Sequence, residues 1–126
     1  ESKQFRKMLI TSFSHGQTSK LEIRVAGLIE QWFPGQFTHN NHRPICIGSK
    51  FPDLINNSLK LTVEINGCYF HGCPKCFPQG GYRGIRDDSP KRKEIFNRYG
   101  YKVIFLWEHE PPSYWRRRIS RILNPI

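Results

Sequence analysis

Acidic residues and long apolar runs are both scarce in this chain of 126 residues. It contains 10 Asp and Glu against 20 Lys and Arg, which gives a formal net charge of +10. This balance favours a polyanionic partner, nucleic acid above all, although a basic surface without a ligand is the simple alternative. No stretch approaches the ~18 consecutive apolar residues of a membrane span, so we expect a protein that does not cross a membrane.

The chain also lacks internal repeats, low-complexity segments and an opening pattern typical of a secretory signal. We therefore expect a single domain over residues 1–126 and an intracellular, cytoplasmic location. Glu1 in place of a start methionine suggests a segment excised from a longer protein. Within the domain, residues 1–17 are expected to form a basic N-terminal arm and residues 113–123 a basic C-terminal helix.

Apolar residues recur with the period of a helix in some segments and with the period of a strand in others. Ser19 and Glu22 form a capping box for a helix that should end before Pro34. The other predicted elements are a hairpin of residues 51–55 and 59–65, a helix capped by Ser89 and stopped by Gly100, a strand over 101–107, and a helix capped by Ser113. This order predicts an α/β fold with a mixed central sheet flanked by helices.

Two carboxylates lie on the neighbouring strands of the predicted hairpin. Glu64 projects from the polar face of its strand, and Asp53 on the paired run can point to the same place. Two carboxylates and a backbone carbonyl form a hard oxygen site suited to Mg²⁺, which polarises phosphoryl oxygens and generates hydroxide from water. The alternative is that Asp53 is a turn residue and Glu64 an exposed strand residue.

The four cysteines include a pair with zinc-knuckle spacing, Cys73 and Cys76. In a reducing compartment such a pair indicates metal binding or redox chemistry rather than a disulfide. A loop of Phe-Pro-Gln-Gly-Gly follows the pair where a thioredoxin-type motif would have a helix, so zinc is the better interpretation. A structural Zn²⁺ requires four ligands, and chance cysteines in a tight loop are the alternative.

Pro52-Asp53 followed by Glu64-Ile65-Asn66 resembles the core motif of the PD-(D/E)xK nucleases, with Asn66 in place of the usual lysine. The segments GCYFHGC, RDD and NRYGYKVIFLWEHE together resemble the very-short-patch (Vsr) repair endonucleases over about residues 18–110. The resemblance implies a restriction endonuclease-like, Vsr-like core and a Mg²⁺-dependent endodeoxyribonuclease that hydrolyses phosphodiester bonds of double-stranded DNA.

Carried over by position, the resemblance makes Asp53 and the carbonyl of Ile65 ligands of the catalytic Mg²⁺. It makes His71 the general base that deprotonates the attacking water. Asn66 falls where the repair family has another histidine, which implies a catalytic contact to phosphate or water. Glu64 is additional relative to the repair enzymes and belongs, as a Mg²⁺ ligand, to the broader nuclease pattern.

Two further acids complete the resemblance. Glu22 matches an acid on the first helix that orients the site, and Asp88, or else Asp87, matches the acid before the second helix. With Asp53 and His71 they are similar to the E-D-x-H-D signature of phage homing endonucleases. The alternatives are that Glu22 serves only the capping box and that Asp88 only favours a helix start.

The repair family has a zinc-binding cysteine at the end of the last strand, where this chain has His109. The resemblance therefore makes His109 the third zinc ligand beside Cys73 and Cys76. His71 is also open as a zinc ligand. The fourth ligand is left open among Cys68, Cys46, His42 and an acid, with core packing as the alternative role of Cys68.

Cations and aromatics supply the expected DNA contacts, namely Lys20 and Arg24 beside Glu22, a cluster on the second helix, and two aromatics before His71. The cluster on the second helix is Lys91, Arg92 and Lys93. Tyr69 and Phe70 match aromatics that wedge between bases in the repair family, with core packing as the alternative. The arginines at 116–118 and 121 fit either phosphate contacts or a solvated helix face.

The sequence thus favours the nuclease domain of a homing endonuclease, bacterial or phage-encoded. A T:G mismatch-specific nickase of very-short-patch repair would share the fold. A zinc-stabilised DNA-binding module without catalysis is the third hypothesis, and Asn66 in place of lysine is its best support.

Overall fold

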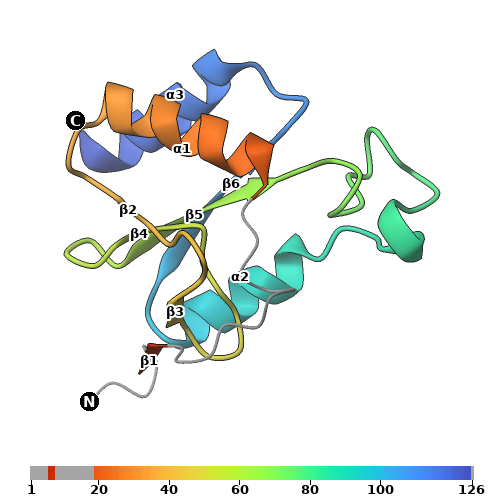
Figure 1. The fold of residues 1–126 in the computed structure, drawn as a ribbon, viewed down its shortest axis with the longest axis horizontal. Helices are drawn as coiled ribbons and strands as arrows, with labels where there is room; N and C mark the ends of the chain where they lie inside the picture. The colour runs from red at the N-terminus through yellow and green to blue at the C-terminus, as the bar shows by residue number, and fades with distance from the viewer. Residues whose placement is uncertain (1–5, 8–18, 126) are drawn as a thin grey trace.

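A mixed four-stranded sheet with helices on both faces forms the body of the protein (Figure 1). The structure is a computed structural model that describes residues 6–7 and 19–125, with side chains for 19–125. The predicted α/β class with a mixed, helix-flanked sheet is confirmed. Its strands, in spatial order, are β2 (Thr38–His39), β4 (Leu54–Asn56), β5 (Leu61–Asn66) and β6 (Lys102–Trp107).

The first helix, α1, extends from Lys20 to Trp32 and begins as predicted. The Ser19 Oγ accepts a hydrogen bond of 3.0 Å from the backbone N–H of Glu22, which satisfies one of the free donors of the first turn. Val25 and Ile29 lie four residues apart on one face of the helix and are fully buried.

The predicted hairpin also forms, with β4 and β5 antiparallel and Leu54 opposite Val63. Every residue of β5 is buried, because its apolar side faces α1 and its polar side faces the helix that follows. That helix crosses over the sheet and leads into β6, which pairs in parallel with β5. β5 is therefore the central strand, flanked by protein on both faces and both edges.

Two helix starts differ from the prediction by one or two residues. In α2 (Ser89–Arg98) the cap position is Asp88, and Ser89 is already helical. In α3 (Pro112–Leu123) the cap position is Pro111, so Ser113 is not the cap. The predicted stop after α2 is correct, since Gly100 adopts a φ of 87° that a side chain would disfavour.

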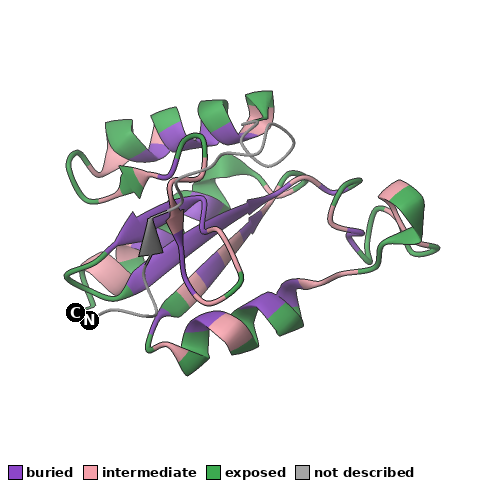
Figure 2. Cartoon of the chain, turned by 60° about the horizontal axis from the view of Figure 1, so that its bottom comes forward, coloured by how far each residue is buried: buried purple, intermediate pink, exposed green. Residues whose placement is uncertain are grey.

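Helices α1 and α3 cover one face of the sheet, and α2 covers the other (Figure 1). Buried residues concentrate on the strands and on the sheet-facing sides of the helices (Figure 2). Trp115 and Ile119 of α3 pack with the apolar side of β5, while Phe96 of α2 packs with Tyr101 and Ile55. Each such side chain contributes roughly 1.5–3 kcal/mol by leaving water.

The loop between β5 and α2 extends beyond the sheet and carries a short 3-10 helix, η1 (Tyr82–Gly84) (Figure 1). At the opposite end, β1 (Arg6–Lys7) pairs with β3 (Ile45–Cys46) in a small separate sheet. The remainder of the expected N-terminal arm lies outside the described residues. In the described part of the chain, no helix is long and apolar enough to span a membrane.

Candidate catalytic and metal sites

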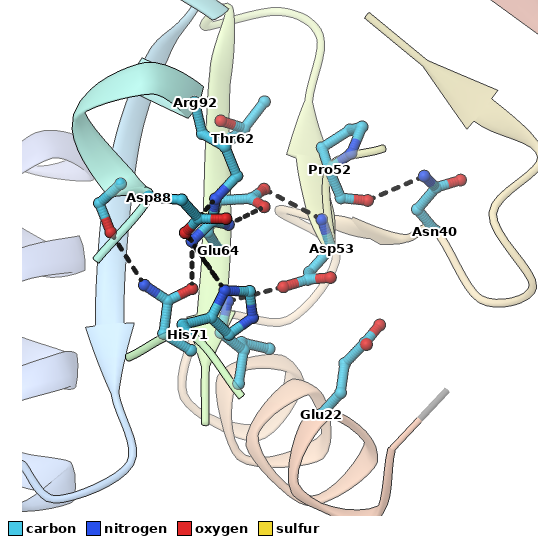
Figure 3. Close-up of polar contacts among 12 residues, drawn as sticks. Glu22, Asn40, Pro52, Asp53, Thr62, Glu64, His71, Asp88 and Arg92 are labelled. Carbon is cyan, nitrogen blue, oxygen red and sulfur yellow. Dashed lines mark hydrogen bonds and ion pairs between the residues drawn. The ribbon is translucent and has the colours of Figure 1, made fainter. Parts of the chain in front are cut away.

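A cavity of about 520 Å³ lies where α1, β5 and the loop after β5 meet. Four carboxylates, two guanidinium groups, an ammonium group and an imidazole share its lining, although they come from separate segments of the chain. The residues are Glu22, Asp53, Glu64, Glu108, Arg43, Arg92, Lys50 and His71. Figure 3 shows Glu22 rising from α1 toward Asp53, with Glu64 and His71 on the far side.

The hairpin fixes Asp53 and Glu64 next to each other through their own backbones. The Oδ2 atom of Asp53 accepts a 2.7 Å hydrogen bond from the N–H of Ile65, and the N–H of Asp53 donates to Glu64 Oε2 at 3.1 Å (Figure 3). Asp53 is 8% exposed and Glu64 is 2% exposed. The predicted convergence of the two acids is therefore present, and the exposed-strand alternative for Glu64 is wrong.

Burial changes the protonation of this pair. Loss of hydration, reinforced by the nearby carboxylate of Glu22, raises the pKa of Asp53 to about 7. Burial and the charge of Asp53 likewise raise the pKa of Glu64 well above its ordinary value. Two adjacent buried acids with raised pKa values are typical of a site that holds a proton or a cation.

Glu22 is part of an ion network rather than a simple capping residue. Its carboxylate accepts hydrogen bonds from Arg43, at 2.6 Å to Oε1 and 2.9 Å to Oε2, and its Oε2 lies 2.9 Å from His39 Nε2. Burial opposes ionisation, but the hydrogen bonds and charge of Arg43 lower the pKa of Glu22 overall. Arg43 Nη2 also lies 3.3 Å from Asp53 Oδ1. Arg43 therefore links two of the expected site acids.

Arg92 points into the site and not toward solvent, which corrects its expected place among the DNA-contacting cations. It is 7% exposed. Its Nη1 donates to Glu64 Oε1 at 3.0 Å, its Nη2 donates to Asn66 Oδ1 at 2.7 Å, and its Nη2 lies 3.1 Å from Asp88 Oδ1. The guanidinium therefore supplies a fixed positive charge beside the strand position that carries Asn66 instead of lysine.

Asn66 does not reach the cavity, contrary to the expected contact with phosphate or water. It is fully buried, its Oδ1 accepts from Arg92, and its Nδ2 donates to Ser89 Oγ at 3.2 Å. Both ends of the amide are thus used inside the protein, where they hold α2 against β5.

His71 pairs with Asp88 at the edge of the cavity. The His71 Nδ1 lies 3.4 Å from Asp88 Oδ1 and 3.3 Å from Arg92 Nη2 (Figure 3). Burial works against its ionisation, but the hydrogen bond from His71 and the charge of Arg92 lower the pKa of Asp88 to about 2. Asp88, at the cap position of α2, makes no side-chain cap bond, so its carboxylate is directed to His71 and Arg92.

A second cluster lies beyond this cavity, where the loop after β5 meets the end of β6. Four candidate metal-ligand atoms there lie within 4.8 Å of one another, and the residues are Cys68, Cys73, Cys76 and His109. The Nδ1 atom of His109 is 3.2 Å from the Cys68 sulfur and 3.6 Å from the Cys73 sulfur. Three soft thiols and one imidazole at this spacing can hold a metal ion in tetrahedral geometry.

The structure selects Cys68 from the alternatives for the fourth ligand. Cys46 is buried on β3, away from the cluster, and all four cysteines are free. Burial raises the pKa of the Cys68 thiol to about 12. His71 contacts Asp88 and Arg92 and is not part of the Cys₃His cluster, which leaves it in the carboxylate site.

The cysteine loop is folded tightly against the segment that leads to α2. Gly72 has a φ of 63°, and a Cβ atom there would lie 2.1 Å from the carbonyl oxygen of Ile85. Only glycine fits such a close approach. The loop leaves Phe70 60% exposed and Tyr69 45% exposed, so the core-packing alternative for these aromatics is wrong.

The other expected DNA-contacting cations lie on the surface. Lys20 and Arg24 are exposed on the first turns of α1, and Lys91 and Lys93 are exposed on α2, on either side of the buried Arg92. On α3, Arg116, Arg117 and Arg121 are exposed as well. Each position is compatible with phosphate contacts.

Sequence reasoning missed Arg43 and His39 as site residues. His39 ends the two-residue strand β2 and Arg43 lies in the irregular loop that follows, so neither position belongs to a periodic pattern, and both reach Glu22 only in the folded chain. An arginine in the loop before Pro52-Asp53 gives only a weak sequence signal for a site residue. Arg92 was assigned to the surface because its neighbours are lysines, although an i, i+4 spacing to Asp88 was visible.

Comparison of the chain with protein-family models, curated proteins and solved structures gives no match. The assignment of function therefore rests on the geometry of the two sites.

Proposed function

We propose that this protein is a metal-dependent DNA endonuclease, with the nuclease domain of a homing endonuclease as the specific type. The observation that carries the proposal is the convergence of Asp53, Glu64, Glu22 and the His71–Asp88 pair on one cavity, in a chain of net charge +10. Each phosphodiester of DNA carries a negative charge that such acids would repel, so a cluster of acids in a basic protein favours an intervening cation.

The oxygen donors suit Mg²⁺, since Asp53 and Glu64 offer carboxylates and Ile65 lines the same cavity. When bound, Mg²⁺ would polarise a phosphoryl oxygen and lower the pKa of water. Asp53, the Ile65 carbonyl and Glu64 are the residues proposed to hold it. In this proposal Arg92 supplies the positive charge that the PD-(D/E)xK lysine supplies elsewhere, and it keeps Glu64 oriented.

His71 is the proposed general base. If its Nδ1–H donates to Asp88, the Nε2 atom carries a lone pair and can take a proton from water. The water oxygen then forms a bond to phosphorus while the opposite P–O bond breaks, and the proton rests on His71 until the leaving oxygen is protonated. Arg92 competes for the same Nδ1, so Asp88 is needed to hold this tautomer.

The Cys₃His cluster is proposed to hold a structural Zn²⁺. The ion would join the loop of residues 68–76 to the end of β6 at His109, and so fix His71 between two anchored points. It would also hold Tyr69 and Phe70 in exposed positions from which they can enter a DNA duplex.

The test is incubation of the zinc-loaded protein with supercoiled plasmid in Mg²⁺ or in EDTA. We expect nicked or linear product in Mg²⁺ only, and His71→Ala and Asp53→Ala should each lower cleavage by at least ~100-fold while DNA binding persists. Glu94→Gln, on the exposed side of α2, is the matched control. Wild-type cleavage by either site variant would refute the mechanism.

A DNA-binding module without catalysis is the second candidate, because Arg43 and Arg92 already neutralise the carboxylates. It predicts salt-dependent binding that is the same in EDTA and in Mg²⁺, with no cleaved product. A duplex with one T:G mismatch, compared with the paired duplex, separates the mismatch nickase from a homing-type enzyme.

A further inference from the structure

We propose that Arg43 occupies the cation position of the carboxylate site, so that a divalent ion binds only as Arg43 leaves Asp53. This inference rests on the proposed function and adds a competing residue to it. A single nitrogen, Arg43 Nη2, contacts both acids at once, at 2.6 Å from Glu22 Oε1 and 3.3 Å from Asp53 Oδ1. A metal ion that bridges carboxylates uses the same oxygens at similar positions.

The oxygens of Asp53 are already divided between two partners. Oδ2 accepts from the Ile65 N–H at 2.7 Å, a bond that the hairpin backbone fixes. Oδ1 faces Arg43. Oδ1 is therefore the Asp53 oxygen without a backbone hydrogen bond, and a hard cation that binds there meets the guanidinium, since two full positive charges at one oxygen repel each other strongly in a site of low polarity.

Hydrogen bonds hold the backbone that carries Arg43, and its side chain lines the open cavity. Asn40 is fully buried, and its Nδ2 donates to the carbonyl of Ile45 and to that of Pro52, each at 2.8 Å; Figure 3 shows the bond to Pro52. The N–H of Arg43 and its Nη1 both donate to the carbonyl of Asn40, and both His42 and Arg43 adopt positive φ, at 64° and 59°. The loop thus positions the backbone of Arg43, while the guanidinium sits at the end of a long flexible stem at the wall of a cavity of about 520 Å³.

Displacement would change the role of Arg43 rather than remove it from the site. Released from Asp53, the guanidinium would remain at the mouth of a cavity that receives a phosphodiester, where it matches a phosphate in charge and geometry. The cation would then take the place of Arg43 beside Asp53, and the substrate phosphate would take the place of Asp53 beside Arg43.

The decisive experiment compares Mg²⁺ and Mn²⁺ binding by isothermal titration calorimetry in zinc-loaded wild type, Arg43→Gln and Arg98→Gln. Arg98 is an exposed arginine of α2 that pairs with exposed Glu94, so its removal matches the loss of charge at a place outside the site. We expect Arg43→Gln to bind either ion on the order of 10- to 100-fold more tightly than wild type, and Arg98→Gln to stay within about twofold.

Equal or weaker binding by Arg43→Gln would overturn the inference alone. Failure of both wild type and Arg43→Gln to bind Mg²⁺ or Mn²⁺ would overturn the proposed metal site together with this inference. Should Arg43→Gln not fold, side-chain NMR of arginine-labelled wild type decides the matter. Saturating Mg²⁺ should shift the Nε signal of Arg43 and speed its exchange with water, and an unchanged signal at saturation would be decisive against displacement.

Discussion

Replacing Asp53 by asparagine should stabilise the metal-free protein while it removes a proposed cation ligand. The pKa of Asp53 rises from 3.8 to about 7, mainly because burial removes its hydration. A difference of roughly three pH units at about 1.36 kcal/mol each corresponds to an upper limit of about 4 kcal/mol. This free energy opposes folding whenever the carboxyl group is ionised.

The sign follows from proton binding. Between about pH 4 and pH 7 the folded state keeps the proton on Asp53 while the unfolded state releases it, so the stability of wild type falls as pH rises through that window. Asparagine cannot ionise and keeps an acceptor for the Ile65 N–H. It also loses the ion pair with Arg43, so the expected gain at about pH 8 is roughly 1–3 kcal/mol, declining to near zero at about pH 4.

Urea unfolding in EDTA, followed by far-UV circular dichroism at several pH values, measures the difference in stability between wild type and Asp53→Asn. The EDTA treatment must be short enough to leave the zinc content unchanged, which elemental analysis checks. Glu94→Gln removes an exposed acid of α2 and should show no comparable dependence on pH. A variant of Asp53 that is less stable than wild type at pH 8 would refute the claim that burial dominates the energetics of this acid. Added Mg²⁺ should stabilise wild type and not Asp53→Asn.

Two other changes test the remaining parts of the site. Arg92→Gln should destabilise the protein by about 3–5 kcal/mol near pH 8, since it leaves buried Glu64 without its ion-pair partner. Lys93→Gln, on the exposed face of α2, should be nearly neutral. Equal urea midpoints for the two variants would contradict the buried ion pair. Cys76→Ser should lose stoichiometric zinc by elemental analysis and lower the Tm by about 10 °C or more. The control Cys46→Ser should retain zinc. Full zinc occupancy in Cys76→Ser would remove Cys76 from the ligand set.

Local patterns were sufficient for most of the secondary structure. The N-cap at Ser19, the alternation in residues 59–65 and the stop at Gly100 each depend on a few neighbouring residues; the cap and the stop form as predicted, and the strand forms at Leu61–Asn66. The starts of α2 and α3 were placed one or two residues late, because proline is compatible with more than one position in the first turn of a helix.

Side-chain orientation on α2 could not be predicted in the same way. Lys91, Arg92 and Lys93 form one run of charge, yet only Arg92 turns inward, because α2 crosses the polar side of β5 and brings that position over Glu64. The crossover after β5 sets this geometry, and nothing in the run itself distinguishes its middle residue.

By itself the sequence determined the three helices and the longer strands, the hairpin that brings Asp53 to Glu64, and the spacing of the cysteine pair, because these depend on contacts between residues close along the chain. Only the tertiary structure decided that Arg43 bridges Glu22 and Asp53, that Arg92 fills the place opposite Asn66, and that Cys68 completes the cluster with His109. These contacts join segments that are far apart in sequence, and their partners are fixed by how the helices and loops pack on the sheet.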